Sequence, residues 1–197
     1  MIKLLKTAGF LLCTTVAAPV MAQDFDKGVA AYQAGDYETA LREWRPLAEQ
    51  GNVSAQINIG LLYTLAESVQ DYAEAAEWYR LAAVQDYAEA QNNLGVLLNN
   101  GNGVIQDYAE AVMWYRKAAV QGNALAQSNL GAAYAKGHGV IQDAVLAHSW
   151  FNISSANGDT VSSEYRGTIE QDLTREQIAE AQALARRCMA SGYQDCD

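Results

Sequence analysis

Apolar residues recur at steps of three and four along most of the chain. Between 72 and 83 they are tyrosines and alanines at the spacing of an amphipathic helix. Asp71 stands before this run, where its carboxylate can cap the helix N-terminus. A second apolar run, from Ala90 to Leu98, follows a short polar interval and ends in glycines suited to a left-handed C-cap. The pattern predicts a helix, a short turn, a second helix and a longer turn.

This pattern repeats with a period of about 36 residues. Four units begin at Asp36, Asp71, Asp107 and Asp143, with spacings of 35, 36 and 36. The residues that share this register are Ala40, Ala75, Ala111 and Ala147; Trp44, Trp78-Tyr79, Trp114-Tyr115 and Trp150-Phe151; Gln56, Gln91 and Gln127; Asn58, Asn93 and Asn129; and Gly60, Gly95 and Gly131. A fixed period of this length predicts an array of helical hairpins, each of which needs its neighbours to bury its apolar face.

One aspartate breaks the register. The pentapeptide Asp-Tyr-Ala-Glu-Ala begins at 71, 86 and 107, and only the copy at Asp86 does not open a unit. It occupies the turn between two helices, where the other units have Gly51 and Gly122. A left-handed backbone there costs an aspartate about 1 kcal/mol more than a glycine.

The second and third units carry a specific motif. It is met as Ala88-Glu89-Ala90-Gln91-Asn92-Asn93-Leu94-Gly95, Gly101-Asn102-Gly103-Val104-Ile105-Gln106-Asp107 and Ala111-Val112-Met113-Trp114-Tyr115-Arg116-Lys117-Ala118-Ala119. The motif resembles the Sel1-like repeat, a relative of the tetratricopeptide repeat, over roughly residues 36 to 156. The resemblance implies an all-α fold, a right-handed superhelical α/α solenoid of helical hairpins with capping helices. In the first unit Ala66-Glu67-Ser68 replaces the Gly-x-Gly turn and one residue is missing, so a different turn is expected there.

The expected organisation has four parts. They are a signal peptide at 1–22, an N-terminal capping helix at 23–35, repeats at 36–158 (36–70, 71–106, 107–142 and a partial unit at 143–158), and C-terminal capping helices with a disulfide-stapled tail at 159–197. Thr174 and Gln177 form a capping-box signature ahead of a helix predicted at 175–189.

The first 22 residues have the features of a secretory signal peptide. Two lysines precede an apolar run from Ala8 to Ala18, and cleavage is expected after Ala22. A retained membrane anchor is the alternative, but the run is shorter than the ~20 residues of a spanning helix. Cys13 follows the bulky Leu12, where a lipoprotein site needs a small residue. The segment therefore predicts a periplasmic or secreted protein without stable membrane insertion.

The charge of the mature chain is strongly negative. Cleavage removes two of the 13 basic residues and none of the 23 acidic ones, which leaves a formal charge of −12. Such a field repels nucleic acid and anionic membranes and favours a basic or neutral partner. A merely solvated acidic surface explains the same composition.

Two cysteines, Cys188 and Cys196, remain near the C-terminus. On a continuous helix they would lie ~12 Å apart, too far for a disulfide, but Gly192 can end the helix between them. In an oxidising compartment we expect the bridge to form and to staple the last helix. A redox-active pair is the alternative interpretation.

The chain shows no catalytic constellation in its sequence. His138 and His148 have no metal-ligand spacing and are interpreted as surface or turn residues. The glutamates at 74, 77, 89 and 110 recur with the repeat and are interpreted as a solvated face. We therefore expect no enzymatic activity, no cofactor and no metal.

A solenoid of this type presents an extended concave surface. If the second helices line it, the exposed face is Ser54, Ile57, Leu61, Thr64, Glu89, Asn92, Val96, Asn99, Leu125, Ser128, Ala132 and Ala135. The set is small and uncharged apart from Glu89, which suits an extended peptide or a helix better than a carboxylate clamp. The repeated Asn58, Asn93 and Asn129 either contact a ligand or bond to the neighbouring backbone.

Three functions fit these features. The first is a non-enzymatic adaptor that binds a protein or peptide during assembly or regulation of the cell envelope. The second is a binding protein or hydrolase for β-lactams or peptidoglycan fragments, because the family resemblance includes cysteine-rich proteins linked to β-lactams. This chain has no cysteine within its repeats, which weakens that transfer. The third is a secreted factor acting on host proteins.

Overall fold

The computed structural model describes residues 24–196, in which helices are joined by turns and loops. The helices are α1 (Phe25–Gln33), α2 (Tyr37–Glu49), α3 (Val53–Leu65), η1 (Glu67–Val69), α4 (Tyr72–Ala83), α5 (Ala88–Asn100), α6 (Tyr108–Ala119), α7 (Ala124–Lys136), α8 (Ala144–Ala156), α9 (Ser162–Ile169), η2 (Glu170–Asp172) and α10 (Arg175–Ala190). Within this range there is no strand, and no helix has the length and apolarity to cross a membrane. The predicted all-α fold is confirmed, whereas the predicted signal peptide lies outside the described residues.

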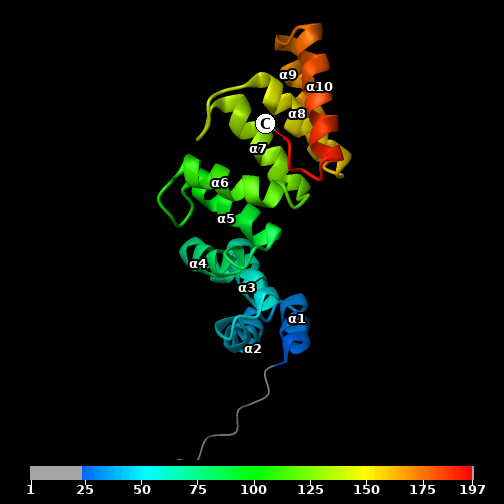
Figure 1. Cartoon of the computed structure of the whole chain (residues 1–197). Coiled ribbons are helices and arrows are strands. Elements are labelled where there is room, and N and C mark those ends of the chain that lie inside the picture. The colour runs from blue at the N-terminus through cyan, green and yellow to red at the C-terminus, as the bar shows by residue number, and fades with distance from the viewer. Residues whose placement is uncertain (1–23, 197) are drawn as a thin grey trace, which may run out of the picture.

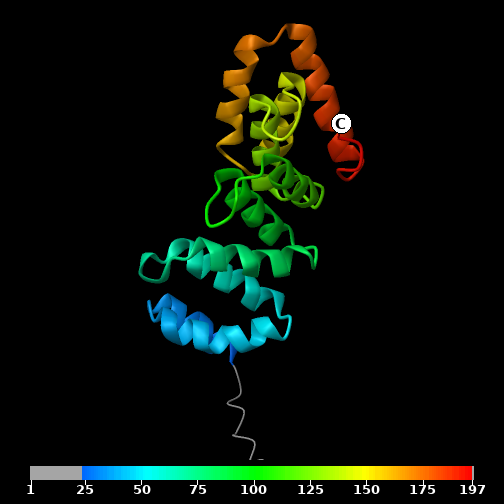
Figure 2. The same cartoon turned by 90° about the vertical axis from the view of Figure 1, so that its left-hand side faces the viewer.

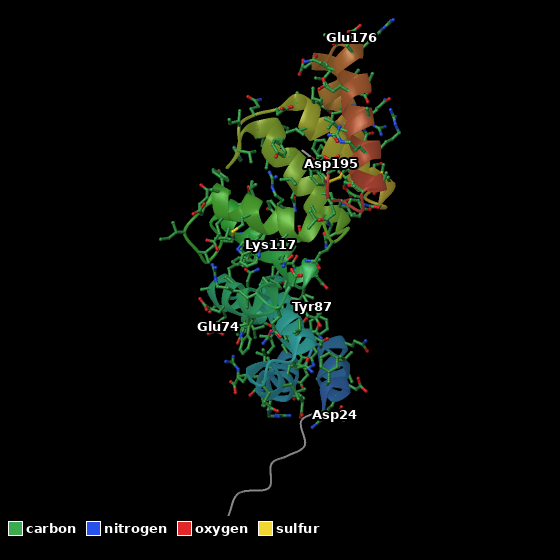
Figure 3. The ribbon with its side chains drawn as sticks, in the orientation of Figure 1. Asp24, Glu74, Tyr87, Lys117, Glu176 and Asp195 are labelled. Carbon is green, nitrogen blue, oxygen red and sulfur yellow. A yellow bond between two sulfur atoms is a disulfide. The ribbon has the colours of Figure 1, made fainter. Side chains whose placement is uncertain are left out.

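The helices stack in chain order along one axis. From α1 to α9 each helix packs mainly against its neighbours in the chain, whereas α10 packs against α8, and the molecule is elongated (Figures 1 and 2). Asp24 before α1 and Glu176 at the start of α10 lie at opposite ends of the array (Figure 3). Such an array has no single central core, and its apolar side chains are buried between successive helices.

Aspartates begin the first helix of each unit, as the sequence predicts. The carboxylate of Asp107 accepts a hydrogen bond from the backbone amide of Glu110 at 2.9 Å. Asp36, Asp71 and Asp143 cap α2, α4 and α8 in the same way. These bonds satisfy amides that have no partner inside the helix.

Glycines lie where the most closely packed helices touch. An added Cβ at Gly60 would lie 2.5 Å from Cε1 of Tyr79, and one at Gly95 would lie 2.6 Å from Cε1 of Tyr115. Each ring therefore occupies the space that a side chain would fill. The equivalent contacts join Gly28 with Trp44 and Gly131 with Phe151. The tightly packed pairs are consequently α1–α2, α3–α4, α5–α6 and α7–α8, which join the second helix of one unit to the first helix of the next.

The recurring glutamines form a series of bonds that we call the glutamine ladder. Nε2 of Gln91 donates to the carbonyl of Ala83 at 3.1 Å, and its Oε1 accepts from Nε2 of Gln121 at 2.9 Å. The equivalent sets are Gln56 with Ala48 and Gln85, and Gln127 with Ala119 and Asn157. The accepting glutamines Gln56, Gln91 and Gln127 are buried, and both the N–H and the C=O of each side-chain amide have a partner. The ladder links each unit to the one that follows.

The turn after α3, in the first unit, differs from the equivalent turns of the later units, as expected. Residues 67–69 form the 3-10 helix η1 in place of a Gly-x-Gly turn. The chain still closes in the same way, since the amide of Asp71 donates to the carbonyl of Tyr63 at 2.9 Å and that of Asp107 donates to Leu98 at 3.0 Å. The missing residue is absorbed in the turn, and the helices keep their register.

The C-terminal cap is a pair of helices that flank α8 (Figure 2). Thr174 and Gln177 make the predicted capping box at the start of α10. Beyond α10, Cys188 and Cys196 form the predicted disulfide, with their Cα atoms 4.4 Å apart. The hydroxyl of Tyr193 accepts a hydrogen bond from Asn157 at 2.8 Å, so the tail meets the last member of the glutamine ladder.

Candidate binding groove

A cavity of about 670 Å³ lies between the last repeats and the C-terminal cap. We call it the groove. Its walls come from the end of α5, from α6 and α7, and from α9 on the other side. The side chains that matter for its chemistry are Asn99, Asn100, Gln106, Tyr108, Asn129, Ala132, Ala135, Lys136, His138 and Tyr165. A volume of this size is typical of binding sites for small molecules or for a few side chains.

The structure brings together only part of the predicted concave face. Those residues that line the groove are Asn99, Ser128, Ala132 and Ala135. Those that lie outside it are Ser54, Ile57, Leu61, Thr64, Glu89, Asn92, Val96 and Leu125. Ile57, Asn92 and Ser128 are each less than a tenth exposed and offer little surface to a partner. The candidate site therefore lies at the third unit and its cap.

The floor of the groove is small and apolar. Ala132 and Ala135 lie on the same side of α7, and the buried rings of Tyr115 and Phe151 line the same cavity. Burial raises the pKa of the Tyr115 hydroxyl above its ordinary value, so this side chain stays neutral at any physiological pH. The floor is suited to contact with an apolar group.

Aromatic rings stand at the edges. The ring of Tyr108 stacks on that of His138 with centroids 4.2 Å apart. On the other side Tyr165 of α9 is half exposed, and its ring packs against that of Phe151 at 5.5 Å. A group that enters the groove therefore meets aromatic surface from two different elements.

Buried serines fix the start of α9. The hydroxyl of Ser162 lies 2.9 Å from the hydroxyls of both Ser128 and Ser154. Burial acts to raise the pKa of the neighbouring Asp159, but hydrogen bonds from Ser162 and from the amide of Val161 outweigh it and lower that pKa. Asp159 is thus a stable charged acceptor for the first turn of α9.

His148 fixes the other end of α9, and its interpretation as a surface or turn residue is wrong. The side chain is fully buried. Asn152 accepts from Nη1 of Arg166 at 2.9 Å through its Oδ1, so its Nδ2 donates to Nδ1 of His148 at 3.0 Å. The proton of the neutral ring then lies on Nε2, which donates to Glu170 at 2.8 Å. The spacing of His148 and Asn152 marks a helix face in the sequence, but the partners from the cap have no repeat to reveal them.

The charge of the groove differs from that of the molecule. Lys136 lies on its edge, and the lining, as far as the chain is described, contains no carboxylate. Nor do residues 24–196 contain a cluster of His, Cys, Asp or Glu side chains suited to a metal ion. The arrangement can hold an apolar group and an anionic one side by side, but it contains no nucleophile paired with a base.

Sequence reasoning missed Tyr108, Lys136, His138 and Tyr165. The sequence could have indicated Lys136, because this residue lies one helical turn after Ala132 on the predicted concave face. Tyr108 and His138 belong to different units and meet only through packing. Tyr165 belongs to the cap, where the periodic pattern has ended.

The solved structures that are similar to this chain include the following two. One is a protective antigen of uropathogenic Escherichia coli with an SLR fold, at 30% identity and a TM-score of 0.60. That match covers 86% of this chain, which spans only 46% of the antigen's length. The other is a Sel1 repeat protein from Oxalobacter formigenes, at 39% identity and a TM-score of 0.57, covering 60% of this chain and 91% of that one. No curated protein sequence matches the chain.

The family model of the Sel1 repeat matches residues 53–87, 88–123 and 124–159, more than half of the chain. The matched units begin with α3, α5 and α7, whereas the units counted from the aspartates begin half a period earlier. Each matched unit contains one of the glycine-mediated helix pairs. The chain belongs to the Sel1 repeat family.

Proposed function

We propose that this chain is a non-enzymatic adaptor of the periplasm or the extracellular space that holds a segment of another protein in its groove. Sel1 repeats are generally protein–protein interaction modules. The observation that carries the proposal is the groove itself, an open cavity of about 670 Å³ on the face of the repeats, walled by a firmly anchored α9. The proposed role is the assembly or regulation of a cell-envelope complex.

The disulfide supports the proposed compartment. Cys188 and Cys196 are both buried and bonded to each other, and such bonds persist in oxidising environments. The signal-peptide pattern of residues 1–22 points the same way. Cell fractionation of a tagged full chain, with the cysteines trapped by alkylation, tests the compartment, and a reduced cytosolic protein would contradict it.

Site-specific cross-linking tests the adaptor role. A photoreactive amino acid at Ala135 lies on the groove floor, whereas one at Met113 lies on an exposed part of α6 outside the groove. In intact cells we expect a discrete cross-linked protein from position 135 and none from position 113. Absence of any product from 135, or the same product from both positions, would contradict the proposal.

The hydrolase alternative has a direct test. Purified protein incubated with a chromogenic β-lactam or with muropeptides is expected to turn over neither. Measurable turnover that disappears in a groove variant such as Ala135→Arg would replace the adaptor role with an enzymatic one.

A host protein is the second candidate partner. The observation that favours it is the solved relative from E. coli, which is described as a protective antigen. Cross-linking from position 135 in an extract of cultured epithelial cells, compared with an extract of the envelope, separates the two partner classes.

A further inference from the structure

The groove has room for a large apolar side chain together with its neighbours in a bound segment. Tyr108 of α6 and Tyr165 of α9 both line it, and Ala132 and Ala135 add small side chains to the same lining. Aromatic rings attract one another at centroid distances of 4.5–7 Å in tilted or offset geometries. An aromatic side chain therefore fits this space better than an aliphatic one.

Charge adds a second element of recognition. The chain has a formal charge of −10, yet Lys136 lies at the edge of the groove and the described lining contains no acidic residue. Lys136 is exposed and makes no ion pair with any described residue. The region around it is thus a locally favourable place for an anion on a surface that otherwise repels anions.

Side-chain amides supply a third element. Asn99 donates to Asn100 at 2.9 Å, and Gln106 donates to the carbonyl of Asn99 at 2.8 Å, which fixes the orientation of this edge. Asn100 is exposed there. Amides of this kind bond to backbone N–H and C=O groups, which an extended segment has available and a helix uses internally.

From these observations we propose that the groove recognises an extended protein segment in which an aromatic residue adjoins an aspartate or glutamate. The aromatic ring lies between Tyr108 and Tyr165 above the alanine floor, and the neighbouring carboxylate pairs with Lys136. This proposed specificity rests on the proposed adaptor function. It states the chemistry of the segment that the adaptor would bind.

Short blocked peptides test the specificity without a known partner. The probe is N-acetyl-Gly-Phe-Asp-Gly-amide, which has no terminal charges, and it is titrated into the isotope-labelled mature chain and followed by NMR. We expect saturable shifts of the Ala132 and Ala135 amides, with millimolar affinity as for other small ligands. Replacement of Asp by Asn or of Phe by Ala in the peptide is expected to weaken binding about fivefold or more in each case.

Two variants assign the effects to residues. Lys136→Gln is expected to abolish the preference for Asp over Asn and to leave the preference for Phe over Ala unchanged. Tyr165→Ala is expected to abolish the preference for Phe over Ala and to leave the preference for Asp over Asn unchanged. Unchanged amide spectra elsewhere in the chain show that each variant is folded.

Equal affinity for all three peptides, shifts away from the groove, or no shift at about 10 mM peptide would overturn the inference. Failure of the adaptor proposal has a different signature, since it shows as the absence of a cross-link from position 135. A cross-link from 135 together with peptide indifference would leave the adaptor standing and remove only its specificity.

Discussion

Asp86 adopts the backbone conformation that its register implies. Its φ of 68° lies in the left-handed region, like the φ of 93° at Gly51 and 85° at Gly122 in the equivalent turns. The carboxylate accepts hydrogen bonds from Nε2 of Gln91 at 2.8 Å and of Gln121 at 3.2 Å. The aspartate therefore combines an unfavourable backbone with two bonds to the glutamine ladder, and the sequence reveals only the first of these.

Substitutions at Asp86 separate the two effects. Asp86→Gly and Asp86→Ala both remove the carboxylate, but only alanine keeps the cost of the left-handed backbone. We expect the alanine variant to be about 1 kcal/mol less stable than the glycine variant in urea unfolding. Asp86→Asn retains an acceptor and tolerates the conformation, so its stability is expected to match the parent protein. Equal stability of the glycine and alanine variants would refute this explanation.

Gly103 is required by its surroundings as well as by its backbone angle. Its φ is 68°, and an added Cβ would collide with the backbone of Tyr72 and Ala73 at the start of α4. Backbone cannot move aside as a flexible side chain can. Gly103→Ala is therefore expected to lower the free energy of unfolding by about 2–4 kcal/mol. Gly167→Ala is the control, because nothing lies within 4 Å of an added Cβ there. A similar loss in both variants would contradict this reasoning.

At the scale of the helices, the period is evident in the sequence but the packed pair is not. Counting from Asp71 joins α4 to α5, whereas the glycine contacts join α3 to α4 and α5 to α6. A repeating pattern has no marked beginning, so periodicity cannot show which neighbours are closest. Gly60 and Tyr79 indicate the pairing only when their contact is seen.

An ion pair between helices makes stability depend on pH. Oε1 of Glu110 accepts from Nη1 of Arg80 at 2.8 Å and from Nε1 of Trp114 at 3.1 Å. The hydrogen bond from Arg80 lowers the pKa of Glu110 below its ordinary value of 4.5, although burial acts in the opposite direction. Because the folded-state pKa is depressed, the contribution is present above pH 4.5 and is lost as the pH falls.

Glu110→Gln is therefore expected to reduce stability at pH 7 by about 0.5–1 kcal/mol, a modest effect because both partners are partly exposed. The difference from the parent protein should shrink as the pH falls below 4.5. Glu77→Gln, at an exposed position on α4, is the control. Thermal unfolding between pH 3 and 7 measures both variants, and a difference that persists undiminished at pH 3 would count against the ion pair.

For the molecule as a whole, periodicity predicts the fold far better than the site. The stacked helices follow from residues that recur every 36 positions. The groove instead depends on α9, which lies beyond the repeats and contributes Tyr165. The helix α9 is held in place through the hydrogen bond between His148 of α8 and Glu170 of η2, and no sequence pattern relates these two elements. For this reason the predicted concave face shares only Asn99, Ser128, Ala132 and Ala135 with the groove and does not include Tyr165.

The disulfide is expected to stabilise one end of the array and not the whole. Reduction frees the tail beyond α10 and weakens the contact of Tyr193 with Asn157. A loop of this length contributes about 2–3 kcal/mol. Since units in such arrays depend mainly on their neighbours, α10 should lose protection from hydrogen exchange before α3 to α6. Exchange measured with and without reductant checks this, and a uniform loss across the chain would disprove it.

The glutamine ladder also bears on how long such a protein can be. Gln56 and Gln91 each offer the next unit the same acceptor. A duplicated copy of residues 71–106 would therefore find a partner on both sides, because its Gln85 would donate to the unit before it and its Gln91 would accept from the unit after it. At the last position Asn157 takes the place of a glutamine and turns to Tyr193 of the tail. The array can therefore lengthen or shorten during evolution by duplication or loss of whole units. Asn157 and Tyr193 end the glutamine ladder on the C-terminal side.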